Sequence, residues 1–597
     1  MPVIVLGLSA FYHDSAAALV RDGAIVAAAQ QERFSRRKHD SGFPAEAAAY
    51  CLDEAGVTLD DVDYIGFYDK PILTFNRLLE TYLAFAPAGL PSFVKSIPVW
   101  VKEKILQKSL LLKGLNGLGR GTADEKKMLF GFHHHSHAAS AFYPSPFDDA
   151  AVLVMDAVGE WATTSLGLGR GKDLTLLKEI RFPHSLGMLY SAFTYYLGFK
   201  VNDGEYKVMG LAPYGEPRYA QAIYDNLIDV KADGSFRLNM DFFDYCTGLT
   251  MTNGRFDRLF GGAPRTPDQP LTQREMDLAR SVQAVTEDIV LRLCRSLHAE
   301  TGEKNLCLAG GVALNCVANG RILRQGPFEN LWIQPAAGDA GAALGVALAI
   351  THTVGRSERV FNGRDGMNGA YLGPAFDAAG IGAALDRLGA VRRDLDDDAL
   401  FETVARALAD QKVVGWFQGR MEFGPRALGN RSILADAGAP AMQRLLNLKI
   451  KYREGFRPFA PAVLREDMAE YFAMDADTPY MLLVAPVRED RLRGLSEDDG
   501  RRQGLEKLNV VRSDIPAVTH VDCSARIQTV HADTNARFHR LLKAFKRYTG
   551  RAVLVNTSFN VRDEPIVCTP GDAYGCFMAT EMDVLVLGNT ILFKDEQ

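Results

Sequence analysis

Histidines are concentrated in one short segment of this chain. Four of its twelve histidines fall within five positions, in the run Phe132-His133-His134-His135-Ser136-His137-Ala138. If this segment is helical, His133 and His137 lie four residues apart on one face, where two imidazoles can bind one metal ion. Histidine runs also occur in solvated surface loops, so composition alone leaves both interpretations open.

Two aspartates stand where strands end and could supply carboxylate ligands beside these histidines. Asp156 follows one apolar strand, and Asp339 lies in the turn Ala337–Gly341 after another. Two histidines with two aspartates make a mixed nitrogen and oxygen set that suits a divalent transition metal such as iron, zinc or manganese. A second interpretation is that Asp339 caps the helix predicted over Ala340–Ile350, and on local grounds the cap is favoured.

The arrangement of a zinc protease is absent from the histidine run. That motif needs glutamate directly after the first histidine, and here His134 holds the position. His134 and His135 are therefore expected either to hydrogen-bond and support the metal ligands or to be exposed at the surface.

Two glycine turns could bind the phosphates of a nucleotide. Gly310 and Gly311 follow the strand predicted over Asn305–Leu308, and Gly338 precedes Asp339 in the second turn. Glycine lets backbone amides approach an anion, and a helix N-terminus favours negative charge. A simple tight turn is the commoner use of two glycines after a strand. Two such turns at one cleft would nevertheless suit a nucleotide.

The C-terminal region carries a second group of residues that could bind a ligand, and many of them are cationic. The group comprises Gly419–Arg431 with Arg426 in a Gly-Pro turn, Lys449, Lys451, Arg453, Arg457, Arg526, and Asn556–Asn560 with Asn556 and Ser558. Guanidinium groups, a lysine and small hydroxyl or amide groups suit a small dianionic phosphate. A basic surface is the alternative. The mixture of arginine, proline and apolar residues in Arg457–Pro461 favours partly buried charge, which is costly without a ligand or partner.

Composition limits the class of protein. With 597 residues, 47% hydrophobic and 23% charged, the chain is predicted to be globular with two to four domains. Its net charge of -6 disfavours a nucleic-acid substrate. Eight cysteines without a C-x-x-C spacing fit reduced thiols in the cytoplasm. The first twenty residues lack the basic region of a signal peptide, and prolines interrupt the apolar region 81–101, so we expect no membrane span.

The elements that must position these residues occur in a repeated pattern. Each copy is a strand, a polar tip and a hairpin of two more strands. The first copy is Val3–Ser9, the tip Ser9–Ser15, Ala16–Val20 and Ala24–Gln30, and the second is Val152–Met155, the tip Asp156–Trp161, Ala162–Leu168 and Leu174–Ile180. Helices predicted over Ala45–Ala55, Leu73–Phe85 and Arg280–His298 complete an α/β layer architecture. A duplicated unit with two polar tips facing one cleft resembles the actin, sugar-kinase and Hsp70 ATPase superfamily.

The remainder of the chain is predicted to form a second α/β region. Residues 358–372 are predicted to link residues 1–357 to residues 373–597. Helices are expected over Asp397–Gln411 and Met442–Lys449, and strands over Val413–Phe417, Met481–Val484 and Ala552–Asn556. The charged stretch Arg488–Lys507 is interpreted as a surface loop.

Several motifs in order resemble one family over nearly the full length of the chain. The chain is similar to the NodU and cephamycin-type (CmcH) O-carbamoyltransferases, a group that includes the tobramycin and saxitoxin carbamoyltransferases. The motifs are Tyr12–Ala16, Glu32–His39, His133–Ala138, Gly204–Gly215, the Gly310 and Asp339 turns, Gly424–Ser432 and Asn556–Asn560.

This resemblance implies an activity that is divided between two domains. The N-terminal domain would be an ATPase-like fold similar to the universal tRNA threonylcarbamoyladenosine enzyme, and the C-terminal domain would be YrdC-like. Carbamoyl phosphate would be hydrolysed to carbamate in the C-terminal domain. Carbamate and ATP would then give carbamoyl adenylate, from which the N-terminal domain transfers the carbamoyl group to a hydroxyl of a small acceptor.

The resemblance also assigns roles by position in this sequence. His13 is expected to act as general base, and His133, His137, Asp156 and Asp339 to hold a divalent metal, usually Fe(II), with Mg as the alternative. The nucleotide contacts are expected at Lys38, Gly310, Gly311 and Asn315. Carbamoyl phosphate is expected to bind Arg426, Lys451, Arg457, Arg526, Asn556 and Ser558. The sequence leaves the oligomeric state undecided, and a homodimer is one of the states considered.

One position departs from the family pattern. The family usually has Asp-Gly after the second strand, whereas this chain has Asp156-Ala157. If the turn needs a positive φ, alanine costs about 1 kcal/mol there. Alanine at this position could therefore affect how the turn contacts a nucleotide, but it does not change Asp156 as a candidate metal ligand.

Two other functions are weighed against carbamoyl transfer. A tRNA threonylcarbamoyl-transfer enzyme follows from the N-terminal half alone, but the acidic pI near 6.1 argues against it. A non-catalytic nucleotide-binding protein is disfavoured by the complete set of candidate base, metal and phosphate residues.

Overall fold

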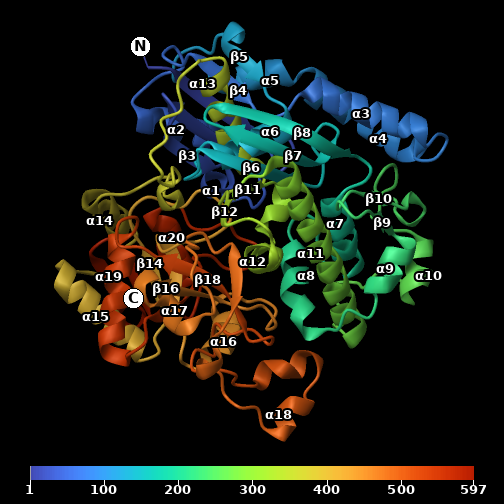
Figure 1. The fold of residues 1–597 in the computed structure, drawn as a ribbon. Helices are drawn as coiled ribbons and strands as arrows, with labels where there is room; N and C mark the ends of the chain where they lie inside the picture. Colours follow the sequence, from blue (N-terminus) through green and yellow to red (C-terminus); the bar gives the residue numbers. More distant parts are fainter. Residues whose placement is uncertain (1) are drawn as a thin grey trace. The chain divides into compact units, whose positions relative to one another are not determined.

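The computed structural model describes residues 2–597 and divides the chain into two compact units. The first unit comprises residues 2–31 and 39–366, and the second comprises Glu32–Lys38 and Met367–Gln597. Helices and strands alternate in both, so the chain has the mixed α/β fold predicted from the sequence (Figure 1).

The first unit contains two five-stranded sheets with the same topology. One sheet has the order β3-β2-β1-β4-β5 and the other β8-β7-β6-β11-β12. In each sheet, three consecutive strands pair antiparallel, and two later strands extend the sheet in parallel from the first of the three. The strands are β1 (Ile4–Ser9), β2 (Ala16–Arg21), β3 (Ala24–Gln30), β4 (Tyr64–Phe67), β5 (Met128–Phe130), β6 (Asp149–Met155), β7 (Ala162–Arg170), β8 (Asp173–Arg181), β11 (Asn305–Ala309) and β12 (Asn330–Ile333). The predicted duplication of the strand unit is therefore confirmed.

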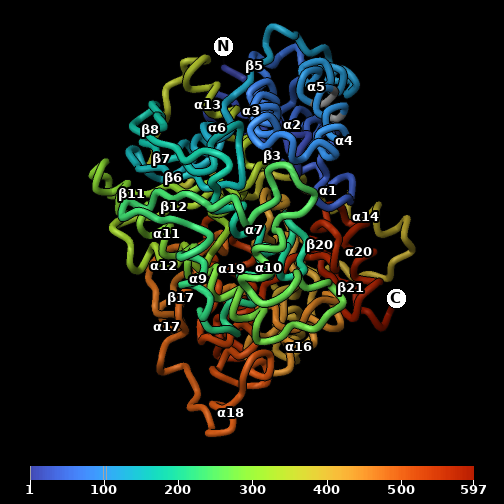
Figure 2. Tube along the Cα trace, turned by 90° about the vertical axis from the view of Figure 1, so that its right-hand side faces the viewer, coloured from blue at the N-terminus to red at the C-terminus, as the bar shows by residue number. Residues whose placement is uncertain are grey.

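Two helices pack closely in this unit and carry most of the candidate metal ligands. They are α6 (His133–Phe142) and α13 (Asp339–Thr353), which lie side by side (Figure 2). A Cβ on Gly345 of α13 would lie 1.8 Å from the carbonyl oxygen of Ser136 in α6. A Cβ on Gly7 of β1 would lie 2.0 Å from the carbonyl oxygen of Ala343. Both glycines therefore permit backbone approaches that any side chain would block.

The first unit contains ten more helices of seven or more residues among those the structure describes. They are α2 (Ala45–Ala55), α3 (Pro71–Ala84), α4 (Leu90–Trp100), α5 (Gln107–Asn116), α7 (Leu186–Tyr196), α8 (Glu205–Leu211), α9 (Ala220–Asn226), α10 (Gly254–Phe260), α11 (Gln273–Thr301) and α12 (Cys316–Gln325), with the small hairpin β9 (Ile228–Val230) and β10 (Phe236–Leu238). Helix α11 begins seven residues before its predicted start at Arg280. Its start is set by a capping box between Thr272 and Glu275, which satisfies free amides of the first turn.

The second unit is built on one nine-stranded sheet in the order β13-β21-β20-β14-β15-β19-β16-β18-β17. Its strands are β13 (Arg393–Asp394), β14 (Val414–Phe417), β15 (Arg431–Asp436), β16 (Ala460–Leu464), β17 (Leu483–Pro486), β18 (Ser524–Val530), β19 (Val553–Ser558), β20 (Val584–Leu587) and β21 (Thr590–Phe593). Its helices are α1 (Glu32–Ser35), α14 (Ala378–Arg387), α15 (Asp397–Ala409), α16 (Met442–Leu445), α17 (Met468–Tyr471), α18 (Glu497–Arg501), α19 (Ala536–Thr549) and α20 (Pro570–Met578). Trp416 and Phe545 are fully buried in its core.

Some predicted bounds differ from the structure for identifiable reasons. The helix expected over Met442–Lys449 is α16 followed by a π-helical turn, Leu446–Ile450. The strand expected from Met481 begins at Leu483, because Met481 has a left-handed φ of 56° that a strand does not accommodate. Residues 358–372 divide between the units after Gly366. Among residues 2–597, no helix combines the length and hydropathy needed to cross a bilayer.

Candidate metal centre and phosphate site

Helix α6 places His133 and His137 on one buried face, as their spacing predicted. The helix begins without a side-chain cap from Phe132. Instead, the carboxylate of Glu160 accepts the backbone amide of His133 at 2.9 Å and that of Lys70 at 3.1 Å. Burial, together with the negative charge of Asp69, raises the pKa of Glu160 to about 7. Glu160 therefore fixes the start of the helix from the same strand tip that carries Asp156.

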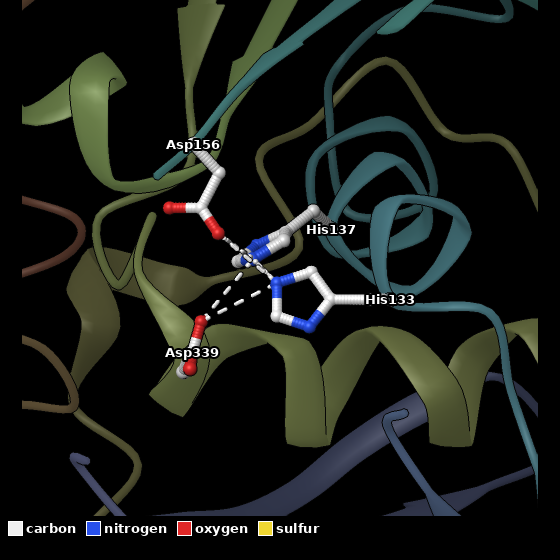
Figure 3. A group of neighbouring side chains, drawn as sticks. All are labelled: His133, His137, Asp156 and Asp339. Carbon is white, nitrogen blue, oxygen red and sulfur yellow. Dashed lines mark hydrogen bonds and ion pairs between the residues drawn. The ribbon is translucent and has the colours of Figure 1, made fainter. Parts of the chain in front are cut away.

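Four side chains direct their ligand atoms at one point (Figure 3). The Nε2 of His133 lies 3.0 Å from Asp156 Oδ2 and 3.6 Å from Asp339 Oδ1. The Nε2 of His137 lies 3.7 Å from Asp156 Oδ2 and 3.4 Å from Asp339 Oδ1. The two Nε2 atoms are 3.1 Å apart.

These separations fit a shared metal ion. Ligand atoms about 2.1 Å from one ion lie about 3.0 Å apart at right angles and about 3.4 Å apart at tetrahedral angles. Two imidazole nitrogens and two carboxylate oxygens are a donor set that suits a divalent transition metal. The four side chains present that set with His133, His137 and Asp339 at most 3% exposed.

Contacts behind the ligands hold both carboxylates. The second oxygen of Asp339 accepts a hydrogen bond from the Tyr68 hydroxyl at 3.3 Å. The second oxygen of Asp156 accepts the backbone amide of Gly311 at 3.2 Å. This second contact links the metal ligands to the first glycine turn.

The electrostatics of the cluster follow from burial and pairing. Burial alone would lower the pKa of His133, but its hydrogen bond to Asp156 and the nearby carboxylates raise that pKa to about 10. The same opposing effects raise the pKa of His137. Burial would raise the pKa of Asp156, whereas its two histidine partners hold it well below the usual value. A metal ion would replace the protons on these imidazoles, because only neutral imidazole is a ligand.

The other two histidines of the run do not face this point. His134 is buried and its Nδ1 lies 2.7 Å from the Ser165 hydroxyl. Burial holds the pKa of His134 well below its usual value. His135 is half-buried, and burial lowers its pKa also. Neither is therefore a solvated surface residue.

His13 lies at the edge of the metal cluster. Its Nε2 is 3.8 Å from Asp339 Oδ2, and its Nδ1 is 3.1 Å from Asp14 Oδ2. Burial would lower its pKa, but Asp339 and the hydrogen bond to Asp14 raise it to about 9. The first strand tip thus brings the candidate base beside the ligands supplied by α6, the second tip and α13.

The glycine turns occupy the positions that the sequence predicted for them. Gly310 has a φ of 86°, and a Cβ there would lie 2.2 Å from the Met155 carbonyl oxygen. Gly338 is the N-cap of α13. The locally favoured interpretation of Asp339 as that cap is therefore wrong, because Asp339 is the first helical residue and its carboxylate faces the histidines.

Asn315 and Ala157 have local surroundings that bear on the nucleotide prediction. Asn315 is the N-cap of α12, and its amide forms two hydrogen bonds with the Gln283 amide, at 2.9 and 3.1 Å. Its side chain thus shapes the turn after Gly311. Ala157 is not among the residues with positive φ, so its replacement of the usual glycine costs no backbone strain.

The predicted phosphate site lies in the second unit. Lys451 is 3% exposed, and its Nζ donates to Ser558 O at 2.6 Å, Asn560 O at 2.8 Å and Asn560 Oδ1 at 2.6 Å. Burial lowers its pKa well below the usual value, and the nearby Arg453, Arg457 and Lys38 lower it further. Lys38, predicted as a nucleotide contact, is therefore part of the cationic group in the second unit.

The remaining predicted phosphate residues lie on two strands and two loops. Asn556 on β19 donates its amide to Gln528 Oε1 at 2.7 Å and to Ala427 O at 3.3 Å, next to Arg426. Arg526 lies on β18, opposite Val484. Arg457 Nη1 lies 3.7 Å from the Glu454 carboxylate. The structure thus joins Lys451 directly to Ser558, and Asn556 to the loop that carries Arg426.

Family models identify both units. The model described as Carbamoyltransferase N-terminus matches residues 4–348, and the model described as Carbamoyltransferase C-terminus matches residues 405–594. The chain belongs to the carbamoyltransferase family. It is an enzyme of that family, and its predicted resemblance to the NodU and cephem-type members is confirmed.

Relatives of this carbamoyltransferase cover all or part of its length. It is 61% identical over 596 residues to an uncharacterized protein of Synechocystis sp., covering 99% of this chain and 97% of that protein. It is 38% identical over 591 residues to the nodulation protein NolNO of Sinorhizobium fredii, covering 98% and 79% respectively. It is 35% identical over 293 residues to the 3'-hydroxymethylcephem-O-carbamoyltransferase of Streptomyces clavuligerus, covering 48% of each.

Two buried residues that the site prediction omitted build the Arg426 loop of this carbamoyltransferase. Glu422 Oε1 accepts the backbone amides of Leu428, Asn430 and Arg431 at 2.7, 2.8 and 3.2 Å. Arg431 is fully buried over the Phe417 ring at 3.5 Å. It donates to four carbonyl oxygens, those of Gln418, Gly419, Asn430 and Pro374. The sequence signal was a glutamate and an arginine on either side of the Gly424-Pro425 turn, among apolar residues.

Replacing Glu422 with alanine is expected to destabilise the second unit. The substitution leaves three buried amides without an acceptor, each at a cost of about 1 to 3 kcal/mol. Glu422→Gln keeps an acceptor oxygen and should be closer to wild type. Thermal unfolding of both variants measures the effect. A Glu422→Ala protein with the wild-type Tm would contradict this role.

Proposed function

We propose that this enzyme is an ATP-dependent O-carbamoyltransferase that uses carbamoyl phosphate and carbamoylates a hydroxyl of a small acceptor, such as a natural product or sugar. The proposal rests on one observation above all: the His13 imidazole lies 3.8 Å from a carboxylate of a group of four side chains that could hold a metal ion. That cluster is in turn hydrogen-bonded to a glycine turn suited to phosphate.

The first step is assigned to the second unit. Carbamoyl phosphate reacts with water there to give carbamate and inorganic phosphate. Arg426, Lys451, Arg457, Arg526, Asn556 and Ser558 are proposed to bind the substrate. Guanidinium groups match the geometry of phosphate oxygens, while the buried Lys451 holds Ser558 and Asn560 in place.

The later steps are assigned to the first unit. A carbamate oxygen attacks the α-phosphate of ATP, and pyrophosphate leaves, which gives carbamoyl adenylate. The acceptor hydroxyl then attacks the carbamoyl carbon while His13 Nε2 takes its proton, and AMP leaves. Gly310, Gly311 and Gly338 are proposed to present amides to the phosphates, with Asn315 shaping the turn after Gly311. For Lys38, which belongs to the second unit, the family resemblance alone supports a nucleotide contact.

A divalent ion, with Fe(II) preferred over Mg, is proposed to bind His133, His137, Asp156 and Asp339. When bound, such an ion supplies a Lewis acid for phosphate oxygens. We further propose that the first unit is an actin-like ATPase fold, which its two equivalent sheet orders support, and that the second unit is YrdC-like.

Product analysis tests the proposed reaction. Purified protein is incubated with ATP, carbamoyl phosphate and a panel of hydroxylated small molecules, and phosphate, AMP and acceptor mass are measured. We expect phosphate and AMP release, with one acceptor gaining a carbamoyl group. Reactions without carbamoyl phosphate are the control. Release of neither phosphate nor AMP with any acceptor would contradict the proposal.

A further inference from the structure

A line of alternating histidine and aspartate side chains leads away from His13 within the first unit. His13 Nδ1 lies 3.1 Å from Asp14 Oδ2, and the other oxygen of Asp14 lies 2.8 Å from His39 Nδ1. His39 Nε2 lies 3.1 Å from Asp203 Oδ1. Both oxygens of Asp14 are thus engaged by imidazoles, and both nitrogens of His39 by carboxylates. The function proposed above assigns a role only to His13.

Two members of this line and two residues beside it have left-handed backbone conformations. Asp14 and His39 have φ values of 52° and 54°, and Phe11 and Asn202, which flank the line in the sequence, have 68° and 65°. Aspartate, asparagine and histidine adopt this left-handed region more readily than other non-glycine residues, whereas it costs a residue such as Phe11 about 1 to 2 kcal/mol. Such strain clusters at functional sites, where the surrounding structure must hold it.

Hydrogen bonds from neighbouring segments maintain these conformations. The backbone amide of Phe11 donates to Ser41 O at 2.8 Å, and that of Ser15 donates to Asp40 O at 3.0 Å. These two bonds fasten the first strand tip to the segment that carries His39. Near Asp203, the carboxylate of Glu205 accepts the amides of Asn202 and Gly204, both at 3.1 Å. The segments that carry the line are therefore held by hydrogen bonds of residues beside its members.

The side chains of the line are mostly buried and fix one another's orientation. The side chains of His13, Asp14 and His39 are 24%, 24% and 25% exposed. The two imidazoles use both oxygens of Asp14, so its carboxylate is held in one orientation toward His13. Because the line begins at the candidate base, its contacts act on the orientation of that base.

We propose that His39 and Asp203 are positioning residues for His13. Asp203 orients the His39 ring, and His39 fixes the Asp14 carboxylate so that it accepts the Nδ1–H of His13. That contact sets the ring of His13 with Nε2 directed toward the Asp339 side of the site, where the acceptor hydroxyl transfers its proton. The inference rests on the proposed function, because it needs His13 to act as the base. The arrangement follows the general logic of a base oriented by a third group.

The test separates the transfer step from the steps before it. His39→Ala, His39→Gln and Asp203→Asn are assayed for acceptor carbamoylation, for phosphate release from carbamoyl phosphate and for carbamoyl adenylate formation. We expect His39→Ala to lower kcat for transfer by up to about 100-fold, since a base displaced by 1 Å loses that much. The KM for the acceptor and the two earlier steps should remain unchanged. His39→Gln, which can still donate to Asp14, should recover most of the rate.

A matched control removes another histidine that is paired with a carboxylate. His539 Nε2 lies 3.0 Å from Glu466 Oε1 in the second unit, and His539→Ala should transfer at the wild-type rate. Wild-type transfer by both His39→Ala and Asp203→Asn would overturn the inference while leaving the proposed function intact. An equal loss of all three activities in both variants would also overturn it, since that result indicates general damage. Absence of transfer by the wild-type enzyme would instead reject the proposed function.

Discussion

Replacing His137 with alanine is expected to abolish binding of the proposed metal ion and to reduce carbamoyl transfer by at least about 100-fold. His137 is fully buried and supplies one of four ligand atoms that all lie within 4.8 Å of one another. Without His137, the candidate ligand set consists of His133 and two aspartates. This set keeps the negative charge of the site but has one imidazole nitrogen fewer to bind the metal ion. Metal content of the purified variant, measured by elemental analysis, gives the direct readout.

Two comparisons make the His137 result specific. His135→Ala removes a neighbouring histidine of the same helix that is half-buried and outside the ligand cluster, so its metal content should match the wild type. Phosphate release from carbamoyl phosphate, assigned to the second unit, should persist in His137→Ala. Full metal occupancy of the His137→Ala protein would show that this cluster is not the metal site.

The candidate metal site was largely predictable because its signals are local. A spacing of four residues puts His133 and His137 on one helical face whatever surrounds them. Asp156 and Asp339 each come after a strand whose last residues are buried, and the carboxyl ends of parallel strands meet at one edge of a sheet. What local reasoning could not decide was the role of Asp339. Its position favoured a cap, but the packing of α13 against α6 turns its carboxylate toward the histidines.

Other features depend on contacts between residues far apart in the chain, and no local sequence pattern predicts them. Lys38 belongs to a seven-residue segment that packs with the second unit, although residues on both sides of it belong to the first. Lys451 is shown by the structure to donate to Ser558 and Asn560, more than a hundred residues away. The close approach of α13 to α6 depends on Gly345, whereas sequence reasoning alone would regard a glycine inside a helix as destabilising. Tertiary packing decides all three.

The two proposed half-reactions predict that single substitutions should separate them. His13→Ala removes the base and is expected to lower acceptor transfer by about 10²- to 10⁴-fold. Phosphate release from carbamoyl phosphate should continue, because the predicted phosphate residues lie in the other unit. Unchanged turnover by His13→Ala would exclude it as the base, and with it the positioning role of His39.

Arg526→Ala is expected to have the opposite effect. Arg526 lies on β18, and a dianionic phosphate bound there would lose a guanidinium partner that lysine or water cannot replace in geometry. Hydrolysis of carbamoyl phosphate should therefore be abolished, while transfer from supplied carbamoyl adenylate should proceed at the wild-type rate. Arg540→Ala is a matched control, because Arg540 is about half exposed and pairs with Asp397 at the surface. If Arg526→Ala also lost transfer from supplied carbamoyl adenylate, the two steps would share residues, and the assignment of one step to each unit would fail.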